Sequence, residues 1–177
     1  MNSGIPDFDT AKPYPRPPTD SLRATIYKHP AHDYTPPDLL AVPWVHTGKL
    51  AFPPGAARHG FAYSSTNFVL LGLVLAHLDG ATSWDEFDQT SFMPADVKAK
   101  LPSVKYVRSG APSSVSRLSG YDRTSYNGQV PTALPGIDVK DVHGVFGGWS
   151  ASDYTSTVGD AATLAYEVYG PKQRIIN

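Results

Sequence analysis

One segment of the chain is almost wholly apolar and predicts its central helix. Between Thr66 and Asp79, apolar side chains occur on all sides of a helical axis, in the sequence FVLLGLVLAHL. Ser64 or Ser65 can cap the start of this helix, and Gly80 is of the residue type favoured just past a helix end. A helix that is apolar all round is ordinarily buried. We therefore predict a buried core helix over residues 66–79.

Weaker patterns predict shorter elements on both sides of this helix. Thr157, with Asp160 three residues later, forms an N-terminal capping pattern for a helix over residues 158–169, which Gly170 and Pro171 end. Similar signals predict brief helices over residues 21–28, 36–42, 82–92 and 95–101. Alternating patches at residues 104–107 and 115–118 have the composition of short strands.

The composition predicts long connections between these elements. The chain has 17 prolines and 15 glycines in 177 residues, so extended irregular segments are expected, notably over residues 7–19. A hydrophobic share of 41% with 18% charged residues is typical of a chain that folds. This length suits one domain with its own core. We therefore predict a single loop-rich domain over residues 1–177.

Charge and residue types exclude several classes of function. The 15 Lys and Arg residues are balanced by 16 Asp and Glu residues without any block of like charges, so no basic stripe exists for a nucleic-acid partner. The longest apolar run, residues 68–76, is short of the roughly 20 residues of a membrane span. The first residues lack the pattern of a signal peptide. Because the chain has no cysteine, it has no disulfide, thiolate nucleophile or Cys-ligated metal, and the cellular compartment stays unknown.

Four segments carry a resemblance to a known family. They read SGIPD at residues 3–7, FPPG at 52–55, FAYSSTNFVLLG at 61–72, and a Gly-rich stretch from Gly147 that leads to STVGDA at 156–161. Their order and spacing resemble the serine β-lactamase-like, or penicillin-binding-protein-like, family. That family contains class C β-lactamases, D-alanyl-D-alanine carboxypeptidases and related esterases.

The third segment resembles the tyrosine motif of this family. The resemblance implies that Tyr63 corresponds to a tyrosine that relays protons during acylation of a catalytic serine. Ser65 stands where many members have the Asn of Tyr-x-Asn, and a hydroxyl is shorter than an amide and has fewer donors. This change favours esterase-type chemistry over β-lactam hydrolysis. Tyr63 and Ser65 are the predicted catalytic residues, and the alternative for Tyr63 is a ring that covers the core edge with its hydroxyl at the surface.

Two other parts of the family's machinery are missing from the sequence. No serine is followed by lysine at the Ser-x-x-Lys spacing, and the near match from Thr25 to Lys28 lies after the SGIPD segment instead of before it. The letters of the third motif occur at His46-Thr47-Gly48, upstream of Tyr63 instead of downstream. Because a relay without a nucleophile has nothing to activate, the chain alone is expected to be inactive.

Two further groups of residues are candidate sites. Ser150 lies in GWSAS, which lacks the last glycine of a Gly-x-Ser-x-Gly nucleophile elbow and is not followed at once by a helix. His29 and His32 have a metal-ligand spacing, and Asp33 could orient His32, but Pro30 breaks the helix that would align them. We expect structural or solvated roles for these residues, and no metal or cofactor.

The resemblance implies a fold and a function. The family has an α/β sandwich with a mostly helical insertion, and the chain matches chiefly that insertion. We therefore predict an α+β fold, mainly helical and loop-rich, that is a partial β-lactamase/transpeptidase-like fold with most of the sheet missing. The predicted function is that of a truncated or fragmentary serine hydrolase, which would act on a small ester, amide or β-lactam if missing segments complete it. The alternative is a non-enzymatic interaction module on the same scaffold, with a protein partner over exposed apolar surface.

Overall fold

The structure, a computed structural model, describes residues 3–9, 22–47, 50, 52–54, 63–115, 118, 120–123, 136–172 and 174–175. Most of the loop predicted over residues 7–19 lies outside these residues, as do Gly48, Gly55 and residues 61–62 of the motifs.

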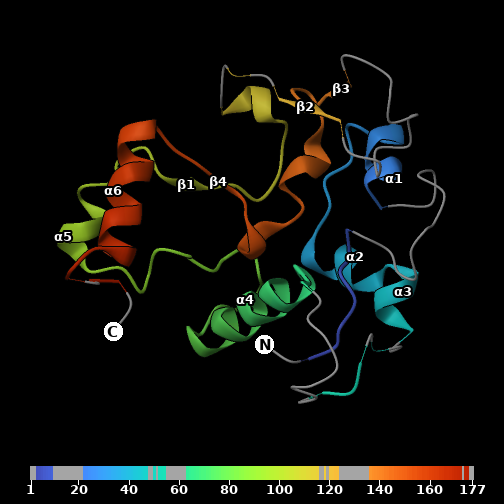
Figure 1. Cartoon of the computed structure of the whole chain (residues 1–177), viewed down its shortest axis with the longest axis horizontal. Coiled ribbons are helices and arrows are strands. Elements are labelled where there is room, and N and C mark those ends of the chain that lie inside the picture. Colours follow the sequence, from blue (N-terminus) through green and yellow to red (C-terminus); the bar gives the residue numbers. More distant parts are fainter. Residues whose placement is uncertain are drawn as a thin grey trace.

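Short helices and very short strands make up the fold (Figure 1). The α-helices are α1 (Leu22–Lys28), α2 (Pro36–Ala41), α3 (Pro43–His46), α4 (Thr66–Leu78), α5 (Ala95–Lys98) and α6 (Val158–Tyr169). The 3-10 helices include η2 (Pro112–Ser114), η3 (His143–Phe146) and η4 (Trp149–Ala151). The strands are β1 (Lys105–Tyr106), β2 (Tyr121–Asp122), β3 (Ile137–Asp138) and β4 (Tyr154–Thr155), paired antiparallel as β1–β4 and β2–β3. The mainly helical, loop-rich α+β class is as predicted.

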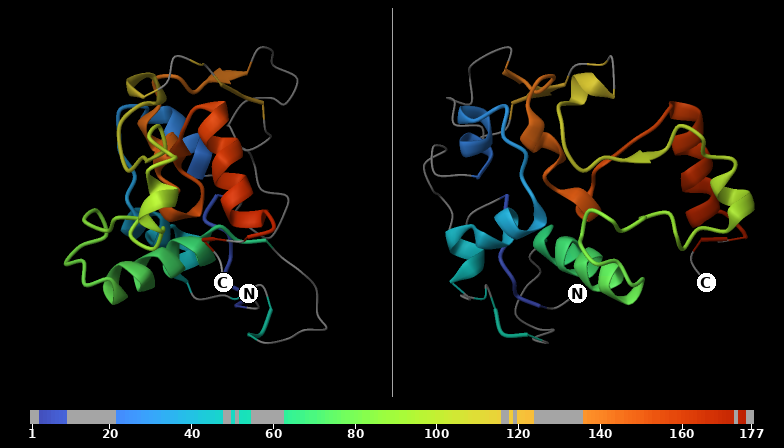
Figure 2. Two further views of the ribbon diagram at one scale, coloured as in Figure 1. Left: turned by 90° about the vertical axis from the view of Figure 1, so that its left-hand side faces the viewer. Right: turned by 180° about the vertical axis from the view of Figure 1, so that it is seen from behind.

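The helices form two groups joined by the middle of the chain. Helices α1, α2 and α3 lie at one end of the molecule and α5 and α6 at the other, in Figure 1 and in the right-hand view of Figure 2. Helix α4 crosses between them, and the segment with η3 and η4 lies above it in Figure 1. Helix α4 therefore spans the region where segments from the whole chain meet.

The core has a larger and a smaller part. Trp149, with 1% of its surface exposed, lies in the larger one, where its ring meets Trp84 and Phe87 edge-on at centroid distances of 5.8 and 6.4 Å. Other members of the larger cluster are Phe8, Leu22, Ile26, Tyr34, Leu39, Val42, Val69, Ala76 and Val142. The smaller cluster consists of three buried side chains with partly buried neighbours from β1 and α6, namely Met93, Val97 and Leu101.

Helix α4 contacts η4 through a glycine. A Cβ atom at Gly72 would lie 2.1 Å from Ser150 Oγ and 2.9 Å from the ring of Trp149, so only glycine allows this approach. Trp149 itself has a φ of 45°, in the left-handed region that non-glycine residues rarely adopt. Close packing of the helix against the buried indole accounts for a conformation that would otherwise be unfavourable.

Two sequence predictions about local structure were wrong. Helix α4 is buried along Thr66, Val69, Gly72 and Ala76 and half-buried at Leu70 and Leu73, whereas its five other large apolar side chains are exposed. No helix forms over residues 82–92, which adopt turns although Thr82 Oγ1 donates to Glu86 Oε2 at 2.6 Å. Side-chain bonds of this kind compete with helical ones, as Asp88 does by accepting from the backbone of Thr90 at 2.8 Å.

Candidate functional site

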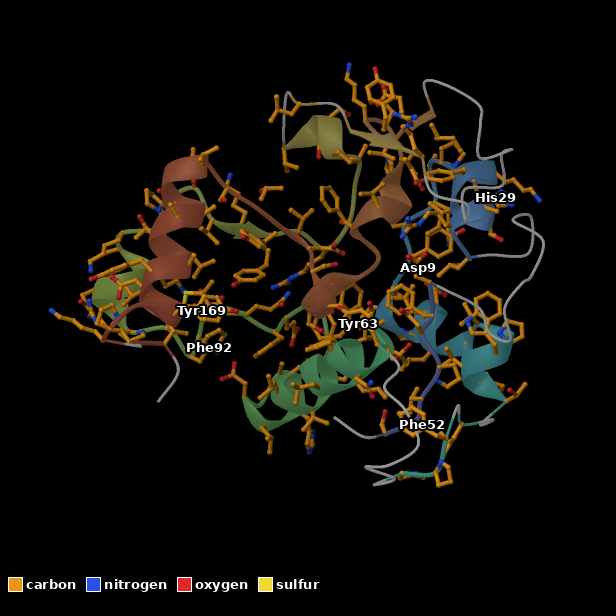
Figure 3. All side chains as sticks on the ribbon, viewed as in Figure 1. Asp9, His29, Phe52, Tyr63, Phe92 and Tyr169 are labelled. Carbon is orange, nitrogen blue, oxygen red and sulfur yellow. The ribbon has the colours of Figure 1, made fainter. Side chains whose placement is uncertain are left out.

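The tyrosine motif lies at the N-terminal end of α4. Tyr63 and Ser64 precede the helix, and Ser65 occupies its N-cap position without a side-chain capping bond. The ring of Tyr63 is 57% exposed and lies 6.1 Å from that of Phe68, centroid to centroid. Its hydroxyl has no hydrogen-bond partner among the described residues, and the side chain lies near the N-terminal end of α4 (Figure 3).

The SGIPD segment lies directly against this helix start. Thr66 Oγ1 donates to Pro6 O at 2.8 Å and accepts from Phe8 N at 2.9 Å, and Ser3 Oγ donates to Asn67 Oδ1. Trp44 Nε1 holds the same segment from α3 by donating to the main-chain oxygen of Asp7 at 2.9 Å. Two of the four motif segments are thus joined by hydrogen bonds.

Two of the segments, together with residues just after a third, line one cleft of about 530 Å³, which we call the motif cleft. Ser65 lines it from the tyrosine motif, Asp9 from just after the SGIPD segment, and Gly148 from the Gly-rich stretch. Arg23, Tyr27, Asp122, Ser152 and Asp153 are among the other lining residues. The cleft brings together Ser65 and polar residues that lie far apart in the sequence, whereas Tyr63 is not among its lining residues.

An ion-pair cluster forms one wall of the motif cleft. Arg23 pairs with Asp9 and also with Asp122, whose carboxylate lies 3.5 Å from the guanidinium and whose side chain is 7% exposed. Tyr27 Oη donates to Asp122 Oδ2 at 2.6 Å. Burial and this hydrogen bond raise the pKa of Tyr27, so its phenol stays protonated. Burial also raises the pKa of Asp9, an effect that Arg23 opposes.

Asp153 is the residue of the motif cleft best suited to exchange protons near neutral pH. Burial raises its pKa to about 6, against the opposing effect of hydrogen bonds from Ser152 and from the backbone of Trp149 and Gly148. Its Oδ2 atom is buried without a hydrogen-bond partner among the described residues. Sequence reasoning missed Asp153, and the one available signal was its position shortly after the Gly147-Gly148 pair.

The other sequence candidates have structural roles. Ser150 Oγ donates to Phe68 O at 3.0 Å in the contact between η4 and α4. Asp33 accepts from Gly110 N at 2.7 Å and faces His143 Nδ1 at 3.1 Å, so it does not orient His32, whose ring packs on Tyr34. No group of three or more potential ligands among the described His, Asp and Glu residues is placed to hold a metal.

The near match to Ser-x-x-Lys and the first residue of the His-Thr-Gly sequence both lie on helices. Thr25 and Lys28 are both exposed on α1, and His46 ends α3. No described helix is long and apolar enough to cross a membrane.

Comparison with solved structures shows that this chain shares part of its fold with a D-stereospecific amidohydrolase and a D-amino acid amidase. The D-stereospecific amidohydrolase from Streptomyces sp. has a TM-score of 0.64 and 21% identity, with 99% of this chain and 46% of that chain covered. The D-amino acid amidase from Ochrobactrum anthropi SV3, complexed with D-phenylalanine, has a TM-score of 0.60 and 18% identity, with 99% and 43% covered.

The chain therefore spans less than half the length of these two structures. No protein-family model and no curated protein sequence matches it.

Proposed function

We propose that these 177 residues are one section of a serine hydrolase that cleaves amides or esters through an acyl-enzyme. The observation that carries the proposal is the motif cleft, which is lined by residues of the tyrosine motif, of the Gly-rich stretch and of the chain just after the SGIPD segment. In this proposal the nucleophile and the third motif belong to segments outside the 177 residues. The names of the two structural neighbours favour amides of D-amino acids as the substrate class.

Tyr63 and Ser65 have defined roles in this proposal. The exposed phenol of Tyr63, with no hydrogen-bond partner among the described residues, passes a proton between the attacking serine and the leaving group. Ser65 lines the motif cleft and offers a hydroxyl that donates to or accepts from the substrate. Neither residue is a nucleophile, so the chain alone has no turnover.

The surface of α4 supports the view that the fold is incomplete. Five large apolar side chains of this helix are 37 to 74% exposed, and we call them the outer face of α4: Phe68, Leu71, Val74, Leu75 and Leu78. Beyond Leu78, an apolar groove of about 690 Å³ continues along Phe92 and Leu164. Contiguous apolar surface of this kind marks contact with another protein segment. In the proposal, the missing sheet and nucleophile helix cover it.

The same outer face supports the second candidate, an interaction module without catalysis. Here the apolar surface of α4 binds a separate protein partner. The two candidates differ in what the neighbouring coding sequence contains and in whether an extended chain turns over substrate.

The test begins with the DNA on both sides of the reading frame. A Ser-x-x-Lys sequence upstream and a His-x-Gly or Lys-Thr-Gly sequence downstream are expected. The extended protein should hydrolyse D-phenylalanine p-nitroanilide, p-nitrophenyl acetate or nitrocefin, and Tyr63→Phe should abolish this activity while Tyr169→Phe, at an exposed position of α6, leaves it unchanged. Flanking sequences without these motifs would favour the interaction module. If the 177 residues alone turn over a substrate and Tyr63→Phe abolishes that turnover, the proposed inactivity of the isolated chain is wrong.

A further inference from the structure

A second cavity lies between α5 and β1 and shares no lining residue with the motif cleft. Its volume is about 480 Å³, within the range of about 300 to 1,000 Å³ that is usual for small-molecule sites. We call it the α5 cavity. None of the four motif segments contributes to it, so an inference about it is independent of the proposed hydrolase function.

The lining of the α5 cavity is positively charged. Lys98, Lys105 and Arg108 line it, and Asp88 is the one acidic residue among the described residues that do so. Lys98 Nζ already pairs with Asp88 Oδ2 at 2.9 Å. Lys105 and Arg108 therefore remain without a carboxylate partner in the lining, in a chain whose net charge is −1.

Arg108 is held in place while most of its donors stay available. Its Nη2 atom donates to the main-chain oxygen of Phe87 at 2.7 Å. A guanidinium has five N–H donors in a fixed planar arrangement, and this bond uses one of them. The remaining donors have the geometry that suits a carboxylate.

Gln89 supplies an independent sign of a missing ligand. This residue lines the α5 cavity, is 7% exposed, and its Nε2 atom is buried without a hydrogen-bond partner among the described residues. Leaving an amide donor buried and unpaired costs free energy, so such groups ordinarily have a partner. An oxygen of a bound anion would provide that partner.

Apart from Thr90, the rest of the lining is mainly apolar. Met93 and Leu101 are buried members of the smaller core cluster, and the partly buried Val104 and Tyr106 pack against them. Side chains of this type accept an aliphatic or aromatic group but not a bare inorganic ion. Asp88 at the same site disfavours a dianion more strongly than a monoanion.

We propose that the α5 cavity binds a small monocarboxylate with an apolar body, such as a hydrophobic amino acid or the C-terminal residue of a peptide. The carboxylate accepts hydrogen bonds from Arg108, Lys105 and the amide of Gln89. Its apolar body lies against Met93, Leu101 and Tyr106.

The probe for this site is N-acetylphenylalanine, with N-acetylphenylalaninamide as its neutral match. Titration of the 15N-labelled chain should give saturable shifts of the Gln89 side-chain amide with the acid, weakened by added salt, and no saturable shifts with the amide. Equal binding of the two compounds, or no saturable binding of the acid, would overturn the proposal. Stronger binding of phenyl phosphate than of the acid would overturn the carboxylate assignment.

Three variants test whether binding of the acid depends on the positive charges of the site and not on a change in folding. Lys105→Gln changes an exposed side chain and should weaken binding of the acid about tenfold, as should Arg108→Gln, because each removes a charge-assisted hydrogen bond. Lys28→Gln, on the exposed side of α1, should leave the affinity unchanged. Circular dichroism would confirm that each variant is folded. Unchanged affinity in folded Lys105→Gln and Arg108→Gln would contradict the proposed site.

Discussion

The hydroxyl of Thr66 donates a hydrogen bond to the main-chain oxygen of Pro6, 2.8 Å away and 60 residues earlier in the chain. The same oxygen atom of Thr66 accepts from Phe8 N at 2.9 Å, and Thr66 is fully buried. One side chain therefore ties the SGIPD segment to the first turn of α4. This link holds Asp9 and Ser65 on the same cleft.

Replacing Thr66 with valine tests this link, because valine has the same shape but no hydroxyl. Thr66→Val would leave the N–H of Phe8 and the carbonyl of Pro6 buried without their partner, which costs about 1 to 3 kcal/mol. Urea denaturation should show that loss in the free energy of unfolding. The matched control is Thr163→Val, since the hydroxyl of Thr163 donates to Gly159 O on the solvent side of α6, and it should change stability by less than about 0.5 kcal/mol. Equal stability of both variants would show that the link does not hold the fold.

Gly72 should be irreplaceable in the contact between α4 and η4. Alanine ordinarily stabilises a helix by about 1 kcal/mol relative to glycine. At this position its Cβ would lie 2.1 Å from Ser150 Oγ, so we expect Gly72→Ala to lower the free energy of unfolding by about 1 to 3 kcal/mol.

Gly159 in α6 provides the comparison for Gly72. The nearest atom to a Cβ there is Thr157 Oγ1 at 3.9 Å. Gly159→Ala should therefore raise the melting temperature while Gly72→Ala lowers it. The same sign of change in both variants would contradict the crowding at Gly72.

Asp153 should make the stability of the chain depend on pH. Because burial raises its pKa to about 6 from 3.8, the folded chain holds this proton more tightly than the unfolded chain does. The stability that this group contributes is therefore fully present below about pH 4 and is lost as the pH rises through 6. A shift of this size corresponds to about 3 kcal/mol. Denaturation should be measured at pH 4 and pH 7. At pH 7, the free energy of unfolding of Asp153→Asn should exceed that of the native chain by about this amount.

Asp88→Asn is the control for this pH dependence. Hydrogen bonds from Thr90 and Lys98 lower the pKa of Asp88 to about 2, so this carboxyl is ionised throughout the range from pH 4 to pH 7. Its variant should differ from the native chain by the same amount at both pH values. If the difference in free energy of unfolding between Asp153→Asn and the native chain is also the same at both pH values, the pKa of Asp153 is not raised.

The outer face of α4 should cause the isolated chain to self-associate. Leu71→Lys and Leu78→Lys each place a charge in this apolar surface, and both positions are exposed, so the fold should tolerate them. Sedimentation velocity should show less association than for the native chain. Val115→Lys, at an exposed position outside α4, should not change the association. If Leu78→Lys instead releases a co-purifying protein, the interaction module is favoured.

Elements with local start and stop signals were predicted well. Helix α6 runs from Val158 to Tyr169, because Thr157 accepts from the backbone of Asp160 and Gly170 ends the last turn. The bounds of α4 were predicted in the same way, but its exposure was not. An apolar sequence cannot show whether its partner surface lies within the same chain.

The motif cleft was only partly predictable. The resemblance pointed to Ser65, but nothing in the sequence pairs Tyr27 with Asp122, which lie 95 residues apart. Over residues 82–92, where a helix was predicted, Thr82 bonds to Glu86 but no helix forms. A contact between distant segments decides the first outcome and local side-chain hydrogen bonds decide the second, and residue periodicity predicts neither.

Because the core is divided into two unequal clusters, the helices packed on them should differ in their free energy of local unfolding. Among the described residues, three buried side chains, Met93, Val97 and Leu101, form the cluster against which α6 rests, whereas α4 is anchored in the larger one. Less buried apolar surface means a smaller free energy of local opening. The backbone amides of α6 should therefore take up deuterium well before those at the buried side of α4, by a partial unfolding that leaves the motif cleft intact.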